Sequence, residues 1–185
     1  MNSYENQLIV IENGLLTTYC LDDKPVWELG RGSSEFRPDI RLHALTVSRK
    51  HGRFQNIEGC WYYVEYDVKN RTRYNDQFIR RGLGGRVRPV MLQNGDALVF
   101  GGGENGRLDS RTVWALFSTR CRKEPWRVVD TRNAQLLTFS DGRDVVRLDK
   151  PPKGTVIEQE EGLGIYMGDL SYLCGKTALQ TELRR

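Results

Sequence analysis

Short runs of alternating apolar and polar residues dominate the first part of the chain. Segments 52–57 and 60–66 follow a period of two, and 8–11 is a continuous apolar run of strand length. Turn dipeptides such as Asn13-Gly14 separate these runs. Short strands at regular spacing, with turns between them, are typical of an all-β sandwich or barrel. We therefore predict an all-β fold, and the sequence shows no internal repeat.

The chain is predicted to divide into two parts at the charged segment 120–125. Residues 1–122 form the first domain, whose closing strand is 113–117. Residues 123–185 are predicted to be a β-rich extension, or the start of a further module, of unknown function. A hairpin is expected within 135–148, because two alternating runs flank a turn-forming segment. The end of the chain, 170–185, has a mildly helix-like apolar spacing.

Composition sets the broad class of the protein. The chain has 185 residues, of which 38% are hydrophobic and 28% are charged. No apolar run approaches the roughly 18 residues that span a bilayer, so we expect no membrane insertion. The first residues lack the basic start of a secretory signal. We therefore expect an intracellular, cytoplasmic protein.

The four cysteines do not form a recognisable set. Cys20, Cys60, Cys121 and Cys174 are far apart in the sequence, and only two histidines accompany them. No metal-ligand spacing is present, and an intracellular chain of this size does not depend on disulfides. We expect buried or half-buried free thiols, no metal and no cofactor.

Positive charge is concentrated in one stretch. Residues 30–90 contain thirteen lysines and arginines but only six aspartates and glutamates. Such a surface is either simply solvated or meets an anion. The candidate anions are nucleic acid, an acidic protein surface and a phosphate group.

Within this stretch, polar motifs follow one another in a defined order, and a further pair lies shortly after it. The motifs are Gly30-Arg31, Ser48-Arg49-Lys50-His51, Asn70-Arg71-Thr72, Asn75-Asp76 and Gly95-Asp96. Together they resemble the motifs of the forkhead-associated (FHA) family of phosphothreonine-binding domains, and the resemblance covers about residues 8–120.

The chemistry of phosphothreonine fits the first two motifs. The phosphate carries about −1.5 to −2 charges and three acceptor oxygens, so its site needs fixed cations and neutral donors. Arg31 offers a planar guanidinium between two glycines, Ser48 a hydroxyl donor and Arg49 a second cation. The resemblance assigns these three side chains to the phosphate. Taken alone, each of them fits an ordinary surface turn better than a phosphate site.

The resemblance also implies roles for the residues around the phosphate. Asn70 would hold the main chain of the bound peptide through its amide, which both donates and accepts. Lys69 would lie beside the peptide, and Arg71 would add a third cation. The loops would be supported by Gly30, His51, Thr72 and Asn75. A catalytic His51 is not expected, because no nucleophile accompanies it at motif spacing.

Two positions depart from the family pattern. Arg71 stands where the family has the glycine of Asn-Gly-Thr, and Asp76 stands where a glycine follows Asn75. If either backbone needs a positive φ, a side chain there costs on the order of 1 kcal/mol. We expect these changes to alter the selectivity for residues that flank the phosphothreonine.

Taken with the resemblance, the sequence predicts an FHA-like β-sandwich that acts in signalling through protein–protein interaction. The partner would be a phosphothreonine-containing protein, a Ser/Thr kinase or its substrate, and no enzymatic activity is expected. Two alternatives stay open. The basic stretch 30–90 could bind nucleic acid, which we favour less, or the domain could be structural and have lost phosphopeptide binding.

Overall fold

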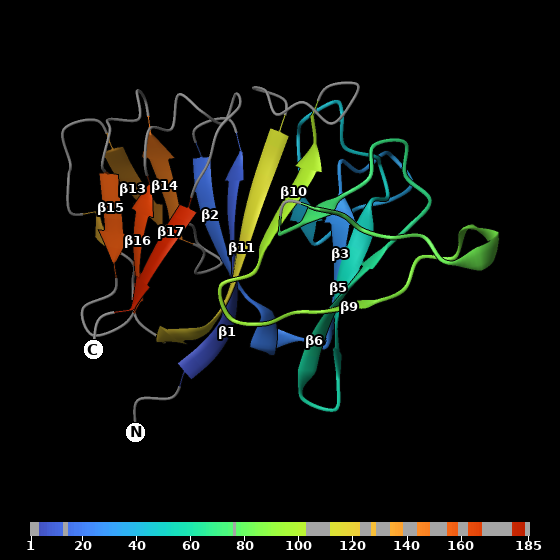
Figure 1. Ribbon diagram of the computed structural model, residues 1–185. Coiled ribbons are helices and arrows are strands. Elements are labelled where there is room, and N and C mark those ends of the chain that lie inside the picture. Colours follow the sequence, from blue (N-terminus) through green and yellow to red (C-terminus); the bar gives the residue numbers. More distant parts are fainter. Residues whose placement is uncertain are drawn as a thin grey trace.

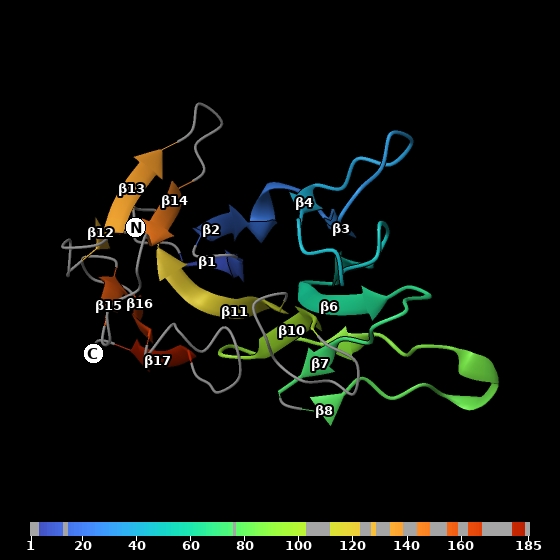
Figure 2. The same cartoon turned by 90° about the horizontal axis from the view of Figure 1, so that it is seen from above.

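The structure is a computed structural model that describes residues 4–12, 15–75, 77–102 and 112–122, and the backbone of six strands between 127 and 183. The regular secondary structure of this described part consists of strands and two short 3₁₀ turns, η1 (Leu21–Asp23) and η2 (Leu83–Gly85). The predicted all-β class is therefore confirmed. Figures 1 and 2 show the strands from two directions.

One layer of the sandwich belongs to an eight-stranded sheet. Its neighbouring strands pair in antiparallel fashion, as the alternating patterns predict for hairpin-connected strands. In spatial order the strands are β13 (Ala134–Thr138), β14 (Asp144–Leu148), β2 (Leu15–Cys20), β1 (Tyr4–Glu12), β11 (Thr112–Arg122), β10 (Ala97–Gly101), β7 (Arg73–Tyr74) and β8 (Gln77–Phe78).

The other layer is a five-stranded sheet that ends at two very short edge strands. Only the β3–β4 pair is parallel, and this pair brings the end of β3 beside the loop that follows β4. In spatial order the strands are β4 (Ile40–Arg41), β3 (Val26–Gly30), β5 (Gly52–Ile57), β6 (Cys60–Glu65) and β9 (Val90–Met91).

The hydrophobic core lies between these two sheets. Phe54 and Tyr63 enter it from the five-stranded sheet, and Phe100 and Phe117 enter it from the eight-stranded sheet. The Tyr63 ring meets Phe54 at 5.2 Å and Phe100 at 5.7 Å between centroids, which suits tilted and edge-on aromatic contacts. The period-two burial of β5 and β6 follows from this arrangement, because alternate side chains face the core.

The stretch 8–11 of strand β1 is buried on both faces. Leu8 and Val10 belong to the sandwich core, whereas Ile9 and Ile11 point to the other face and are also fully buried. Trp114, on the neighbouring strand β11, is buried on that outer face as well. A continuous apolar run is the sequence signature of a strand covered on both sides, and 8–11 is such a run.

The extension contributes strands to two sheets. Its hairpin β13–β14, expected within 135–148, continues the eight-stranded sheet by pairing with β2. Its other strands form a four-stranded sheet, of which β16 contacts β11. In order these strands are β12 (Arg127–Val128), β15 (Thr155–Glu158), β16 (Leu163–Met167) and β17 (Leu179–Leu183).

Two expectations from the sequence are wrong. Residues 179–183 form strand β17, although the spacing of 170–185 resembled a helix, because pairing with β16 outweighs weak local periodicity. Cys60 is exposed, because it directly follows the tight turn of Glu58 and Gly59. Cys20 is half-buried as expected, and burial raises the pKa of its thiol to about 12. The side chains of Cys121 and Cys174 lie outside the described residues.

Candidate phosphopeptide site

Three loops meet where the predicted phosphate residues lie. They are the segments 31–39 after β3, 42–51 after β4 and 66–72 after β6, and we call them the phosphate loops. Backbone hydrogen bonds join the first two. The Arg31 N–H donates to the carbonyl of Ser48 at 3.0 Å, and the Gly32 N–H donates to the carbonyl of Arg49 at 2.9 Å. Residues that are 17 positions apart in the sequence are therefore fixed side by side.

Gly30 makes this close approach possible. A Cβ atom at Gly30 would lie 2.3 Å from the backbone oxygen of Arg49, far inside van der Waals contact. The Leu42 N–H also donates to the Gly30 carbonyl at 2.9 Å, so the loop after β4 packs against the same residue. A side chain at position 30 would push this loop away from Arg31.

The guanidinium of Arg31 is held from below. Its Nε donates to the carbonyl of Val47 at 3.2 Å, and the side chain is half-buried. Its terminal nitrogens have no hydrogen-bond partner among the described residues. The anchored Nε orients these nitrogens, and a planar guanidinium fork of this kind has the geometry to pair with two phosphate oxygens.

Ser48 and Arg49 complete the group around Arg31. The Ser48 side chain is half-buried, and Arg49 is exposed. The next residue, Lys50, is also exposed, and its ammonium lies 4.7 Å from the centroid of the Tyr66 ring. Three neighbouring basic side chains thus concentrate positive charge at one end of the sandwich.

His51 lies beneath the loops and is fully buried. The Ser48 N–H donates to its Nδ1 at 3.1 Å, so the neutral ring carries its proton on Nε2, which lies 3.1 Å from the Thr72 hydroxyl oxygen. Desolvation lowers the pKa of His51 to about 4. The ring is therefore neutral at pH 7, and both of its nitrogens are used in joining the Ser48 loop to the Thr72 loop.

Thr72 is the central residue of a buried polar network. Its hydroxyl oxygen lies 3.0 Å from the Tyr63 hydroxyl, and its N–H donates to Glu65 at 2.6 Å. Burial raises the pKa of the Glu65 carboxyl, and the bonds from Thr72 partly offset this effect. A network of this kind gives the β6–β7 loop one defined position.

Asn70 joins the β6–β7 loop to the β4–β5 loop. Its Nδ2 donates to the carbonyl of Thr46 at 2.8 Å, which leaves the side-chain oxygen as an acceptor. The Thr46 hydroxyl in turn accepts the N–H of Gly102 at 3.1 Å. The sequence did not reveal the supporting roles of Thr46 and Val47. They act through their backbone carbonyls and through the Thr46 hydroxyl, and such contacts leave no motif in the sequence.

Lys69 and Arg71 flank Asn70, and both are exposed. The Arg71 guanidinium lies 4.9 Å from the centroid of the Phe78 ring, a cation–π contact that turns it toward β8. Arg71 does not have a positive φ, so replacing the family's glycine costs no backbone strain here. Asp76 lies outside the described residues.

Asn75 lies apart from the phosphate loops. It adopts a φ of 45°, which asparagine tolerates better than most residues, and its Nδ2 donates to Asp96 at 2.9 Å. Its Oδ1 accepts the N–H of Ala97 at 2.9 Å. Asn75 therefore fixes the turn between β7 and β8 against the turn before β10, and it does not touch Arg31 or Ser48.

No group of three or more His, Cys, Asp or Glu in the described part of the chain is placed to hold a metal ion. None of the helices described there has the length and apolar character needed to cross a membrane.

Comparison with solved structures gives many FHA-domain matches with low sequence identity. The yeast Pml1 splicing factor is 20% identical, with 63% of this chain and 80% of that chain covered and a TM-score of 0.49. An FHA domain of Chlamydia trachomatis is 14% identical, with 62% and 96% covered and a TM-score of 0.46. An FHA domain of an Arabidopsis thaliana protein is 17% identical, with 63% and 86% covered and a TM-score of 0.46.

The comparison at the level of families is more specific. No curated protein matches the sequence. The family model of the FHA domain, however, matches residues 27–101, which include all three loops described above. The resemblance inferred from the motifs is therefore confirmed over residues 27–101, which match the family model of the FHA domain.

Proposed function

We propose that this chain binds a phosphothreonine-containing segment of a partner protein, with Arg31, Ser48 and Arg49 holding the phosphate. The match to the FHA family supports a phosphopeptide-binding interaction module. Members of this family are generally interaction modules and not enzymes. The observation that carries the proposal is the anchoring of Arg31 Nε on Val47 beside Ser48 and Arg49. In this arrangement two cations and a hydroxyl lie on a hydrogen-bonded loop frame that is already fixed before the ligand binds.

Each side chain has a chemical task in this proposal. The terminal nitrogens of Arg31 would donate to two phosphate oxygens, and Arg49 would balance the second negative charge. The Ser48 hydroxyl would donate to the third oxygen. The side-chain oxygen of Asn70 would accept a backbone N–H of the peptide, because the amide nitrogen already holds Thr46.

The partner follows from the same chemistry. A phosphothreonine is made by a Ser/Thr kinase, so the partner would be such a kinase or one of its substrates, and the chain would act in signalling. A cytoplasmic location fits this role and stays a prediction.

The first test removes the Arg31 side chain. Charge-assisted hydrogen bonds are worth about 1.5–3 kcal/mol each, so Arg31→Ala should weaken a phosphothreonine peptide by roughly 10- to 150-fold. Ser48→Ala should weaken it less. The peptide is first selected from an oriented phosphothreonine library with unphosphorylated peptides as reference, and affinities are then measured by fluorescence anisotropy.

Arg86→Ala is the matched control, because it removes the same charge from η2's protruding loop and leaves the phosphate loops intact. Its affinity for the phosphothreonine peptide should stay within about twofold of the wild-type value. An equal loss in both variants would show general electrostatic attraction instead of a site. Unchanged affinity in a folded Arg31→Ala protein would refute the assignment.

The second test separates the nucleic-acid alternative. For nucleic acid, the logarithm of the binding constant falls with the logarithm of the salt concentration, at a slope near −0.9 per phosphate contacted. Binding of a single phosphothreonine gives a shallow slope in the same plot. Tight binding of DNA or RNA with a slope steeper than about −4, and no phosphopeptide binding, would favour the basic stretch as a nucleic-acid surface.

A further inference from the structure

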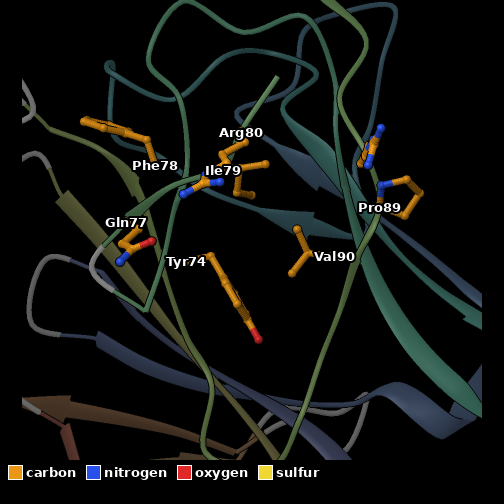
Figure 3. A pocket seen from close by; sticks show the side chains of 8 residues that line it. Tyr74, Gln77, Phe78, Ile79, Arg80, Pro89 and Val90 are labelled. Atoms are coloured by element: carbon orange, nitrogen blue, oxygen red, sulfur yellow. The ribbon is translucent and has the colours of Figure 1, made fainter. Parts of the chain in front are cut away.

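A groove lies where the two sheets of the sandwich end. Strand β8 is the edge of the eight-stranded sheet, and β9 is the edge of the five-stranded sheet. Phe78 from β8 and Val90 from β9 both line a groove of about 250 Å³, with Tyr74 between them (Figure 3). Arg31, Ser48 and Arg49 do not line it, so the groove is distinct from the residues proposed to hold the phosphate.

The floor of the groove is apolar and held in place. Tyr74 and Val90 pack against the hydrophobic core, and Ile79 is buried. The Tyr74 hydroxyl donates to Asp96, which fixes the direction of the ring. The Ile79 N–H donates to the carbonyl of Thr72 at 3.0 Å. An apolar side chain entering the groove would therefore meet a preformed surface.

The rim of the groove is basic. Arg80 and Arg88 line it, and the guanidinium of Arg73 lies 4.7 Å from the centroid of the Phe78 ring, on which Arg71 also stacks. Residues 69–91 contain seven basic residues and one acidic residue. The guanidinium groups of Arg80 and Arg88 have no hydrogen bond or ion pair with any described residue.

We propose that this groove binds an acidic peptide segment of a partner protein, anchored by one aromatic or aliphatic side chain and requiring no phosphorylation. The anchor would occupy the space over Tyr74 and Val90, and flanking carboxylates would meet Arg80 and Arg88. Arginines whose terminal groups are unpaired carry the charge complementarity that selects such a segment. The inference does not depend on the phosphate site.

Nucleic acid suits this surface less well. Binding of single strands uses open aromatic faces on which bases stack, and the Phe78 ring already carries the guanidinium groups of two arginines. The groove is also small and apolar at its floor, which fits one side chain better than a row of bases.

The test uses an unphosphorylated, fluorescein-labelled peptide of glutamate and aspartate residues with one central phenylalanine. Binding to the full chain is followed by anisotropy at low and physiological salt. Reversing both groove charges, Arg80→Glu with Arg88→Glu, should weaken binding by about 10-fold or more, because two attractions become repulsions. Phe78→Ala should weaken it by about 3-fold or more, because the groove loses part of its apolar wall.

Two control proteins locate the effect. Arg37→Glu with Arg41→Glu makes the same charge change at exposed arginines of the opposite side, at and before β4, and should change binding by less than about 3-fold. Arg31→Ala should leave binding unchanged. It also separates this inference from the proposed function, since the probe contains no phosphate.

Several results would overturn the inference. These are no binding of the acidic peptide, an equal loss in the two charge-reversal proteins, and equal binding of a peptide whose phenylalanine is replaced by serine. Loss of binding in Arg31→Ala alone would place the acidic peptide at the phosphate loops. Stronger binding of a single-stranded oligonucleotide than of the peptide would replace the acidic segment by nucleic acid. If the double reversal does not fold, Arg80→Gln with Arg88→Gln gives the same comparison.

Discussion

The phosphate loops and the loop 80–88 are built from the same residue types but are supported differently. Both place arginines beside glycines. In the first, Gly30 packs directly against the backbone of Arg49, and hydrogen bonds fix Arg31 on its neighbours. In the second, positions Gly84 and Gly85 are surrounded by open space.

The side chains of the two regions differ in the same way. Leu83, at the tip of the loop 80–88, is 100% exposed, whereas Val47 beneath Arg31 is buried. Figure 1 shows this loop as the green segment that projects from the sandwich, ending in η2. An Arg-Gly pattern therefore does not define a phosphate site by itself. In the proposed function the frame beneath Arg31 makes the difference, because it lowers the cost of ordering the side chain on binding.

The largest expected effect concerns the histidine under the phosphate loops. The unfolded-state pKa of His51 is 6.5 and its folded-state pKa is about 4. Above pH 6.5 the ring is neutral in both states and its contribution to stability is complete. Between pH 6.5 and about 4 only the unfolded state binds the proton, so the free energy of unfolding should fall by roughly 3 kcal/mol.

The measurement compares the wild type with His51→Gln by urea denaturation from pH 7 to pH 4. The wild type should lose about 3 kcal/mol more than the variant over this range. Glu65, whose pKa is raised, acts in the opposite direction, because its contribution to the free energy of unfolding is lost as pH rises. Both proteins contain Glu65, so the comparison between them is not affected. Identical pH profiles would show that His51 is not held neutral by burial.

The next effect compares one glycine from each region. Gly30→Ala should cost about 2 kcal/mol of stability and most phosphopeptide affinity, because its Cβ would overlap the Arg49 carbonyl. Gly84→Ala meets open space and has only its φ of 73° to accommodate, so it should cost about 1 kcal/mol and leave affinity unchanged. Equal effects of the two variants on phosphopeptide binding would remove the distinction between the regions.

The smallest effect is expected at the tip of the loop. Leu83→Ser should change the free energy of unfolding by less than about 0.5 kcal/mol, because a fully exposed side chain makes no packing contribution. The matched change at a buried leucine, Leu42→Ser, should destabilise the protein by at least about 2 kcal/mol. Thermal unfolding of both variants checks this, and a large loss in Leu83→Ser would show that the loop packs against the domain.

Much of the fold could be predicted from the sequence, because strands leave a local record. The alternation in 52–57 and 60–66 reflects side chains that face the core in turn, and both segments are strands. The run 8–11 reflects burial on two faces. Weak periodicity failed at 179–183, where pairing with β16 decides the structure.

The candidate site was predictable in its residue types but not in its contacts. Arg31, Ser48 and Arg49 were found as motifs, and the structure brings them together. The inward turn of Asn70 toward Thr46 depends on a carbonyl 24 positions away, which no local pattern records. The same is true of Arg71, whose side chain stacks on Phe78 instead of lying free beside the phosphate loops.

The sequence by itself determined the β class, the basic stretch and the chemistry available to hold a phosphate. Those properties depend on side-chain type and on spacing within one strand or turn. Only the tertiary structure decided which arginines are anchored, where the two sheets end, and that a groove opens between β8 and β9. The reason is that these features are contacts between distant segments, whose positions are set by the packing of two sheets around one core.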